Sequence, residues 1–96
     1  MTVLLLGRNP RIVTKVVAAI SAAGHSAEGM TTDEAALARI AEGDVSALIL
    51  GGGVEPPSRE KLLAAANAKG VTIVQGPHIG DRDADEYVRA EVIPRL

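Results

Sequence analysis

Short apolar runs alternate with helical patterns along the whole chain, and this alternation constrains the fold more than any other feature of the sequence. The clearest runs are 2–6 (TVLLL), 45–50 (VSALIL) and 71–74 (VTIV), and a weaker one covers 25–30. After each run, apolar side chains recur at the spacing of an amphipathic helix. Strands that are apolar at nearly every position are typical of a parallel sheet that helices cover on both faces.

Residues that favour helix ends mark the boundaries of the predicted helices. Asn9 precedes Pro10, a pair that favours an N-cap followed by the first helical residue. We expect the other helix starts at the capping box Thr31-x-x-Glu34, at Ser58 after Pro56-Pro57, and at Asp83-x-x-Glu86. The first three helical patterns are followed by Gly24, Gly43 and Gly70, where glycine commonly ends a helix.

The order of these segments predicts a single domain, 1–96, with a three-layer αβα architecture. Consecutive strands joined by helices require right-handed parallel crossovers, which place helices on both faces of the sheet. We expect a four-stranded parallel sheet of order 2-1-3-4, with the weak second strand at one edge. The fourth strand then forms the opposite edge, and an uncovered edge invites pairing or a partner.

Composition excludes several classes of function. The chain of 96 residues has a formal net charge of −2, and Tyr87 is its only aromatic residue. It therefore lacks the basic stripe and the stacking aromatics that direct nucleic-acid binding needs. It has no cysteine for disulfides or thiolate chemistry, and its apolar runs are too short to cross a membrane. The N-terminus does not read as a signal peptide, so we expect a cytoplasmic location.

The predicted topology places any ligand site beyond the carboxyl ends of the first and third strands, where the strand order reverses. The candidate binding residues on this rim are Arg8, Asn9, Gly51, Gly52, Gly53 and His78. The glycine run lets a ligand approach the backbone and offers amides to an anion, although it also suits a sharp turn. His25 enters the second strand at the opposite rim, so the two histidines are not expected to share a metal ion.

The rim offers no recognisable catalytic constellation. Ser58 is interpreted as a helix cap and Arg8 as a solvated loop charge. The acidic residues are interpreted mostly as first-turn helix charges; they are Asp33, Glu55, Asp81 and Asp83. Because no nucleophile has an evident base, we predict no catalytic residue, no metal site and no cofactor, and we expect that the chain is not an enzyme.

The segment VLLLGRNPRIVTKVVAAISAAGHSAEGMTTDEAALARIAEGDVSALIL resembles a response-regulator receiver domain, which has a flavodoxin-like fold. The resemblance implies magnesium-binding acids after the first strand, a phospho-acceptor aspartate ending the third strand, and a lysine after the last strand. Here Gly7 and Arg8 stand at the acidic positions and Gly51 at the acceptor position. Glycine cannot accept a phosphoryl group and a cationic arginine repels magnesium. The resemblance therefore implies a degenerate receiver, with a (βα)4 fold, that cannot be phosphorylated.

The segments LLLGRNP and DVSALILGGGV are also similar to the nucleotide-binding half of short-chain dehydrogenases and sugar epimerases. The dinucleotide fingerprint of that family needs several glycines after the first strand, whereas here Gly7 is followed by Arg8 and Asn9. An intact dinucleotide site is not expected.

Two hypotheses of function stay open at this point. The first is a non-catalytic interaction or regulatory module that binds a protein partner or self-associates as a homodimer. The second is a Rossmann-like domain that holds a small anionic ligand, a nucleotide or a phosphate, over Arg8, Asn9 and residues 51–53.

Overall fold

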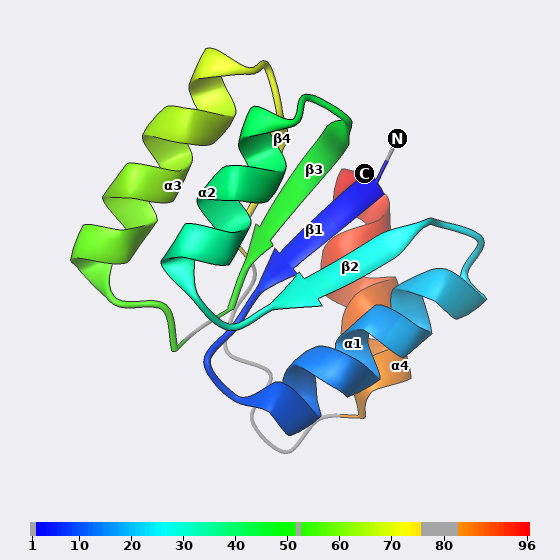
Figure 1. Ribbon diagram of the computed structural model, residues 1–96. Helices are drawn as coiled ribbons and strands as arrows, with labels where there is room; N and C mark the ends of the chain where they lie inside the picture. Colours follow the sequence, from blue (N-terminus) through cyan, green and yellow to red (C-terminus); the bar gives the residue numbers. More distant parts are fainter. Residues whose placement is uncertain (1, 52, 76–82) are drawn as a thin grey trace.

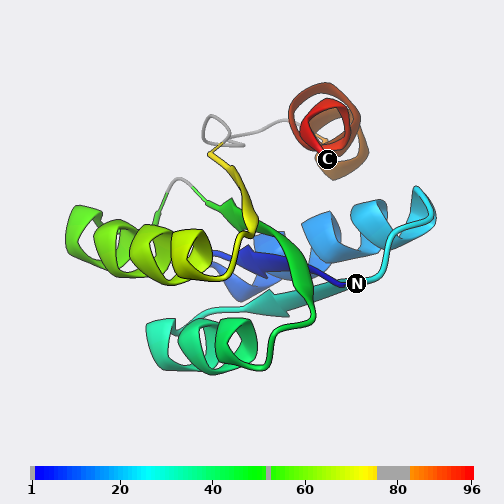
Figure 2. The same ribbon diagram turned by 90° about the horizontal axis from the view of Figure 1, so that it is seen from above.

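The computed structural model describes residues 2–51, 53–75 and 83–96, which form a parallel sheet between two layers of helices (Figure 1 and Figure 2). The strands are β1 (Thr2–Leu6), β2 (Ala27–Met30), β3 (Val45–Leu50) and β4 (Thr72–Val74). The helices are α1 (Pro10–Ala22), α2 (Asp33–Ala41), α3 (Pro56–Ala68) and α4 (Ala84–Tyr87). The strand order is β2-β1-β3-β4 with all neighbours parallel, which confirms the predicted fold class. In the described part of the chain, no helix has the length and apolar character needed to cross a bilayer.

The two central strands bury side chains on both faces of the sheet. β1 and β3 pair in register, with Leu5 beside Ile49 and Leu6 beside Leu50. Leu5 and Ile49 pack in the core cluster that includes α1 and the C-terminal helix, whereas Leu6 and Leu50 pack against residues of α2 and α3. Burial on both faces explains why these strands are apolar at nearly every position. The edge strands β2 and β4 are both shorter than the runs that predicted them.

Several predicted helix boundaries are confirmed by the backbone and by side-chain caps. Asn9 caps α1 by accepting from the Arg11 amide, and Asp83 caps α4 by accepting from the Glu86 amide. The glycines that follow α1, α2 and α3 adopt positive φ angles, which residues with a side chain rarely do; they are Gly24, Gly43 and Gly70.

Two predicted caps are wrong. The N-cap of α2 is Thr32, whose hydroxyl accepts from the Ala35 amide, and not the preceding Thr31. The N-cap of α3 is Glu55, which makes no side-chain cap, while Ser58 lies inside the helix and is buried. Both residues contact Arg8 instead, because the Thr31 backbone carbonyl and the Ser58 hydroxyl accept hydrogen bonds from its guanidinium.

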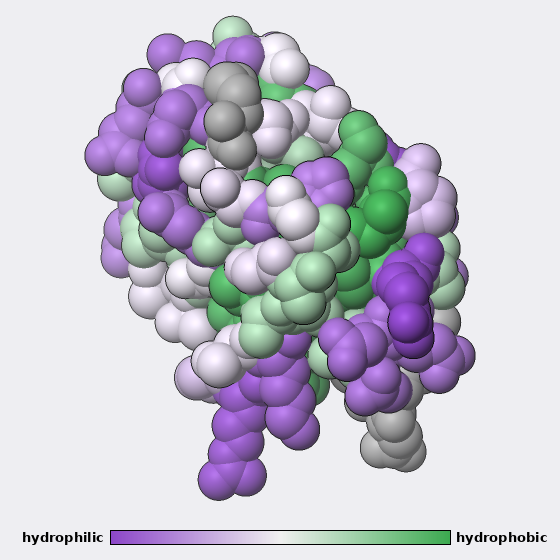
Figure 3. Space-filling model, turned by 90° about the vertical axis from the view of Figure 1, so that its right-hand side faces the viewer, coloured by the Kyte–Doolittle hydropathy of each residue, from purple (hydrophilic) through white to green (hydrophobic). Residues whose placement is uncertain are grey.

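The C-terminal helix begins as α4, continues as a π-helix, η1 (Val88–Val92), and ends in a 3-10 turn, η2 (Ile93–Arg95). Tyr87, Val88 and Val92 are buried in the cluster that includes α1 and the sheet. The sequence predicted this helix but not its widening into a π-helix, a feature that is frequent at functional sites. Figure 3 shows the side of the molecule formed by α1 and this helix, where hydrophobic surface lies between hydrophilic side chains.

Arg39 connects the end of α2 to the amino ends of β2 and β3 by hydrogen bonds. Its guanidinium donates to Glu28 of β2 at 2.5 Å, to Glu42 at 2.8 Å and to both carboxylate oxygens of Asp44. The hydrogen bonds to Asp44 and then to Glu28 raise the pKa of Arg39, and Arg39 lowers the pKa of Asp44. Glu28, which interrupts the apolar pattern of β2, is thus explained by an ion pair.

Candidate functional site

Arg8 follows β1 at the carboxyl edge of the sheet, which is the rim where the strands end, and connects three loops. Its Nη2 donates to Oδ1 of Asp33 at 2.6 Å, its Nε to Oε1 of Glu55 at 3.0 Å, and its Nη1 to the Thr31 carbonyl at 2.8 Å. Asp33 begins α2 and Glu55 precedes α3, so one guanidinium joins the segments that follow β1, β2 and β3. Arg8 is therefore not a solvated loop charge, and these two acids are more than first-turn helix charges.

Ser58 completes what we call the Arg8 cluster, made of Arg8, Asp33, Glu55 and Ser58. The Ser58 hydroxyl donates to Oδ2 of Asp33 at 2.6 Å and accepts from Nη2 of Arg8 at 3.2 Å. Ser58 is only 8 % exposed. Since a buried hydroxyl is costly unless it is hydrogen-bonded, this serine is a structural member of the cluster.

The cluster favours the charged forms of its ionisable groups. The hydrogen bond from Ser58, followed by that from Arg8, lowers the pKa of Asp33, and the hydrogen bond from Arg8 lowers the pKa of Glu55. The same contacts, with Glu55 first and Asp33 second, raise the pKa of Arg8. The positive charge of Arg8 is consequently balanced inside the protein at neutral pH. Among residues 2–51, 53–75 and 83–96, no group of three or more His, Cys, Asp or Glu side chains is placed to hold a metal ion.

The loop after β3 is fixed by its own backbone and by Arg59 of α3. The Gly51 amide donates to the Leu6 carbonyl at 2.8 Å, and Arg59 donates to the carbonyls of Gly51 at 2.6 Å and Val54 at 2.9 Å. A Cβ atom on Gly51 would lie 3.3 Å from the Leu6 oxygen and 3.4 Å from the Gly7 Cα, so the close approach of β1 and β3 favours glycine here. The glycine run had suggested that its amides are open to an anion, but the Gly51 amide is already hydrogen-bonded to the Leu6 carbonyl. The contact of Arg59 with this loop could not be predicted from the sequence, because its partners are mostly backbone carbonyls.

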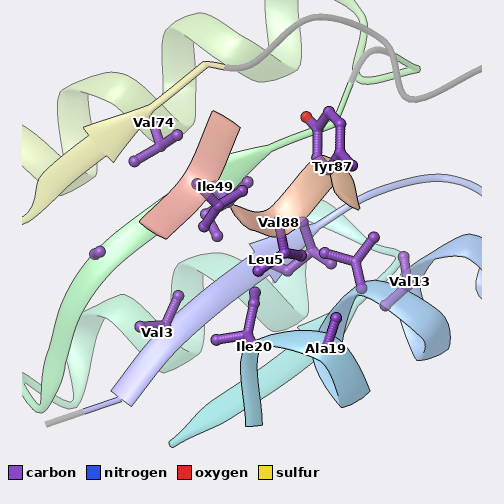
Figure 4. Packing of buried hydrophobic residues seen from close by; sticks show 12 residues of the cluster. Val3, Leu5, Val13, Ala19, Ile20, Ile49, Val74, Tyr87 and Val88 are labelled. Carbon is purple, nitrogen blue, oxygen red and sulfur yellow. The ribbon is translucent and has the colours of Figure 1, made fainter. Parts of the chain in front are cut away.

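A pocket of about 130 Å³ opens at the same edge, on the side of α1 and the C-terminal helix. Its walls come from β1, β3, the segments that follow them, the first half of α1, and α4. The lining residues are Leu5, Gly7, Arg8, Asn9, Ile12, Val13, Val16, Ile49, Gly51, Gly53 and Tyr87. Figure 4 shows how Leu5 and Ile49 of the sheet, Val13 of α1 and Tyr87 of α4 come together from different elements.

The pocket unites most of the candidate residues that the sequence predicted. Arg8, Asn9, Gly51 and Gly53 all line it, whereas Gly52 and His78 lie outside the described residues. The apolar wall of the pocket was not predicted, because Ile12, Val13 and Val16 have the spacing of ordinary core positions in an amphipathic helix. The available signal was their place within the first turns of a helix that starts at the predicted rim.

Replacing Ser58 by alanine is expected to raise the pKa of Asp33, because it removes the hydrogen bond that lowers this pKa most. Arg8 and Lys61 still favour the carboxylate, so the pKa stays below its ordinary value. A depressed folded-state pKa stabilises the protein above the unfolded-state value, about 4, and that stability is lost as the pH falls through the folded-state pKa. The free energy of unfolding of Ser58→Ala should therefore fall less on acidification than that of the wild type.

The measurement is a carboxyl carbon NMR titration of Asp33, together with urea unfolding at several acidic pH values. Ser21→Ala, which changes an exposed serine near the end of α1, is the matched control and should leave both curves unchanged. An unaltered pKa of Asp33 in Ser58→Ala would show that the Ser58 hydrogen bond does not act on this carboxylate in solution.

Comparisons with known proteins identify the fold of this chain. No protein-family model matches the sequence, and a search of curated proteins found no match. A de novo designed Rossmann 2x3 fold protein, solved by NMR in solution, is similar with a TM-score of 0.64 and 14% sequence identity. The alignment covers 99% of this chain and 73% of the designed chain. At this identity the similarity concerns the fold alone, and it shows that the chain has a Rossmann-like α/β fold.

Proposed function

We propose that this chain is a non-catalytic regulatory module that binds a small molecule in the pocket at the carboxyl edge of its sheet. The observation that carries the proposal is the position of the pocket. Its lining includes residues that follow β1 and β3, the strands between which the order of the sheet reverses. Open parallel sheets bind their ligands at this switch point.

That the module is non-catalytic is supported by the hydrogen bonds of Ser58, Asp33 and Arg8, reactive or charged groups in the described part of the rim. Ser58 and Asp33 are hydrogen-bonded to each other, and Arg8 binds both. The position that would hold a receiver's phospho-acceptor is Gly51, which has no side chain to react. Ligand binding takes the place that phosphorylation has in receiver domains, and the receiver-like origin of the chain is part of the proposal.

The test is a screen of neutral and anionic small molecules by thermal shift, followed by amide chemical-shift mapping. A ligand present at a hundredfold its Kd adds about 2.7 kcal/mol to the free energy of unfolding, which raises Tm by about 10–20 °C in a domain of this size. The perturbed amides should be those of Gly7, Val13 and Gly51, which line the pocket.

A pair of matched variants shows whether binding occurs in the pocket. Ile12→Phe enlarges a half-buried side chain of the pocket wall and should abolish the thermal shift. Leu37→Phe makes a similar change to a half-buried side chain of α2, in the opposite core cluster, and should preserve it. Equal loss of binding in both variants, or perturbed amides confined to the opposite edge of the sheet, would contradict the proposal.

Self-association as a homodimer is a second candidate, supported by the position of β4. This strand ends the strand order, so among the described residues no strand pairs with its outer edge. It ranks second because β4 has only 3 residues, and short edge strands protect a sheet against pairing. Light scattering coupled to size exclusion should then give a dimer for the wild type and a monomer for Thr72→Lys, because lysine on an edge strand opposes pairing. A monomeric wild type at high micromolar concentration removes this candidate.

A further inference from the structure

We infer that the pocket binds an uncharged, largely apolar molecule about the size of a single six-membered ring. This inference rests on the proposed function and names the class of its ligand. It differs from the phosphate or nucleotide that the glycine run suggested.

The volume of the pocket limits how much of a ligand it can bury. Its volume is about 130 Å³. An engineered apolar protein cavity of about 150 Å³ binds benzene, so a single ring fits and a nucleotide does not. A nucleotide would have to leave most of its atoms outside the pocket, where the lining residues do not reach it.

The charge of the pocket argues against an anion. Arg8 is the charged side chain in the described lining, and each of its guanidinium nitrogens donates to a protein oxygen in the Arg8 cluster. An anion that bound Nε or Nη2 of Arg8 would have to displace Glu55 or Asp33, whose own charges would then oppose it. The aliphatic part of Arg8 can still contact an apolar ligand, as arginine side chains often do.

The start of α1, which also faces the pocket, offers few donors to an anion. Pro10, its first residue, has no amide hydrogen, and the next amide, that of Arg11, is bound to the Asn9 side chain. The Gly51 amide is bound to the Leu6 carbonyl. Two backbone amides of the kind that forms anion sites in other parallel sheets, those of Arg11 and Gly51, are therefore already hydrogen-bonded here.

The apolar walls supply the favourable free energy for a neutral ring. Leu5, Val13, Ile49 and Tyr87 are each at most 8% exposed and belong to the same core cluster. A ring in contact with them leaves water for an environment like the protein interior, whereas a carboxylate or phosphate there would lose its hydration without gaining a partner. Neutral and charged molecules of the same shape should consequently differ strongly in affinity.

The experiment compares cyclohexanol with cyclohexanecarboxylate, inorganic phosphate and adenosine monophosphate, each titrated into the full chain. Amide chemical shifts report the site, and the fluorescence of Tyr87, the only aromatic residue, gives a second readout because cyclohexanol does not absorb. We expect cyclohexanol to shift the amides of Gly7, Val13 and Gly51 and to bind at least about tenfold more tightly than the carboxylate. Ile12→Phe should weaken its binding by about tenfold or more, and Leu37→Phe should not change it.

The outcomes separate this inference from the proposed function. Binding of phosphate or the nucleotide to the pocket amides, with none of cyclohexanol, overturns the inference and leaves the proposed function standing. No effect of any probe, here and in the wider screen, overturns both. If Ile12→Phe does not fold, nuclear Overhauser effects between cyclohexanol and Val13 or Tyr87 of the wild type decide the site, and their absence despite binding overturns the inference.

Discussion

Tyr87→Ala is expected to reduce the free energy of unfolding by about 3–5 kcal/mol, the range measured for deleting a buried aromatic side chain. Tyr87 is 4% exposed and packs in the core cluster that joins the sheet, α1 and the C-terminal helix. As the only aromatic residue, it fills a volume that the surrounding Val, Ile and Ala side chains cannot close without moving. A domain of this length is stable by roughly 5–15 kcal/mol, so this single change threatens the fold.

Urea unfolding monitored by far-ultraviolet circular dichroism measures this loss without depending on the deleted tyrosine. Arg89→Ala, an exposed change in the same helix, is the control and should alter the free energy of unfolding by less than about 0.5 kcal/mol. If Tyr87→Ala cost no more than Arg89→Ala, the C-terminal helix would not be docked on the sheet as the structure has it.

The fold could be predicted from the sequence because its signals are local. β1 and β3 are buried on both faces, so their apolar runs are continuous, and the glycines after α1, α2 and α3 end helices by their own conformational freedom. Where two neighbouring residues carry the same signal, the prediction failed by one position: Thr31 and Thr32 both favour an N-cap, and only packing decides that Thr32 is used. The π-helix depends on how Tyr87, Val88 and Val92 fit the sheet, which no local pattern encodes.

The sequence predicted that the candidate residues lie near one another, but it did not predict the partners of Arg8. Parallel topology brought Arg8, Asn9, Gly51 and Gly53 to one pocket, as expected for loops that follow neighbouring strands. The two acidic partners of Arg8, however, are 25 and 47 residues away in the sequence, and Arg8 was therefore interpreted as a solvated loop charge. The available signal was that Arg8, Asp33 and Glu55 carry opposite charges on loops predicted to lie at the same rim. Because Arg8 is paired with these acids, the expected ligand changes from an anion to a neutral molecule.

The carboxyl edge therefore has two halves that differ in polarity. On the side of α2 and α3, the Arg8 cluster holds the loops with hydrogen bonds among charged groups. On the side of α1 and α4, the same loops line an apolar pocket. Since Arg8 belongs to both halves, a ligand that moves its aliphatic part also moves the guanidinium that Asp33 and Glu55 bind.

The packing of α1 on the edge strand β2 provides the other prediction with a large expected effect. A Cβ atom on Gly29 would lie 2.9 Å from Cγ2 of Val17 and closer still to Cγ1 of Val13. Valine side chains in helices have one strongly preferred rotamer and cannot turn away. Alanine is otherwise better suited to a strand than glycine, so the contact with α1 decides the sign. We expect Gly29→Ala to lower the free energy of unfolding by about 1–3 kcal/mol.

A double-mutant cycle identifies the cause of that loss. Val13→Ala alone should cost about 2 kcal/mol, because it removes buried methyl groups, but it also vacates the space that the new Cβ needs. The loss in the free energy of unfolding of the double variant Gly29→Ala/Val13→Ala should therefore be smaller than the sum of the two single losses by about 1 kcal/mol or more. Gly29→Ala/Val16→Ala is the matched control. Val16 is a buried valine of the same helix and is not among the nearest neighbours of the Gly29 Cβ position. The losses of free energy in this control cycle should be additive within about 0.5 kcal/mol. Additivity in both cycles would mean that β2 moves away from α1 instead, and that glycine is not required for the close packing of this edge strand.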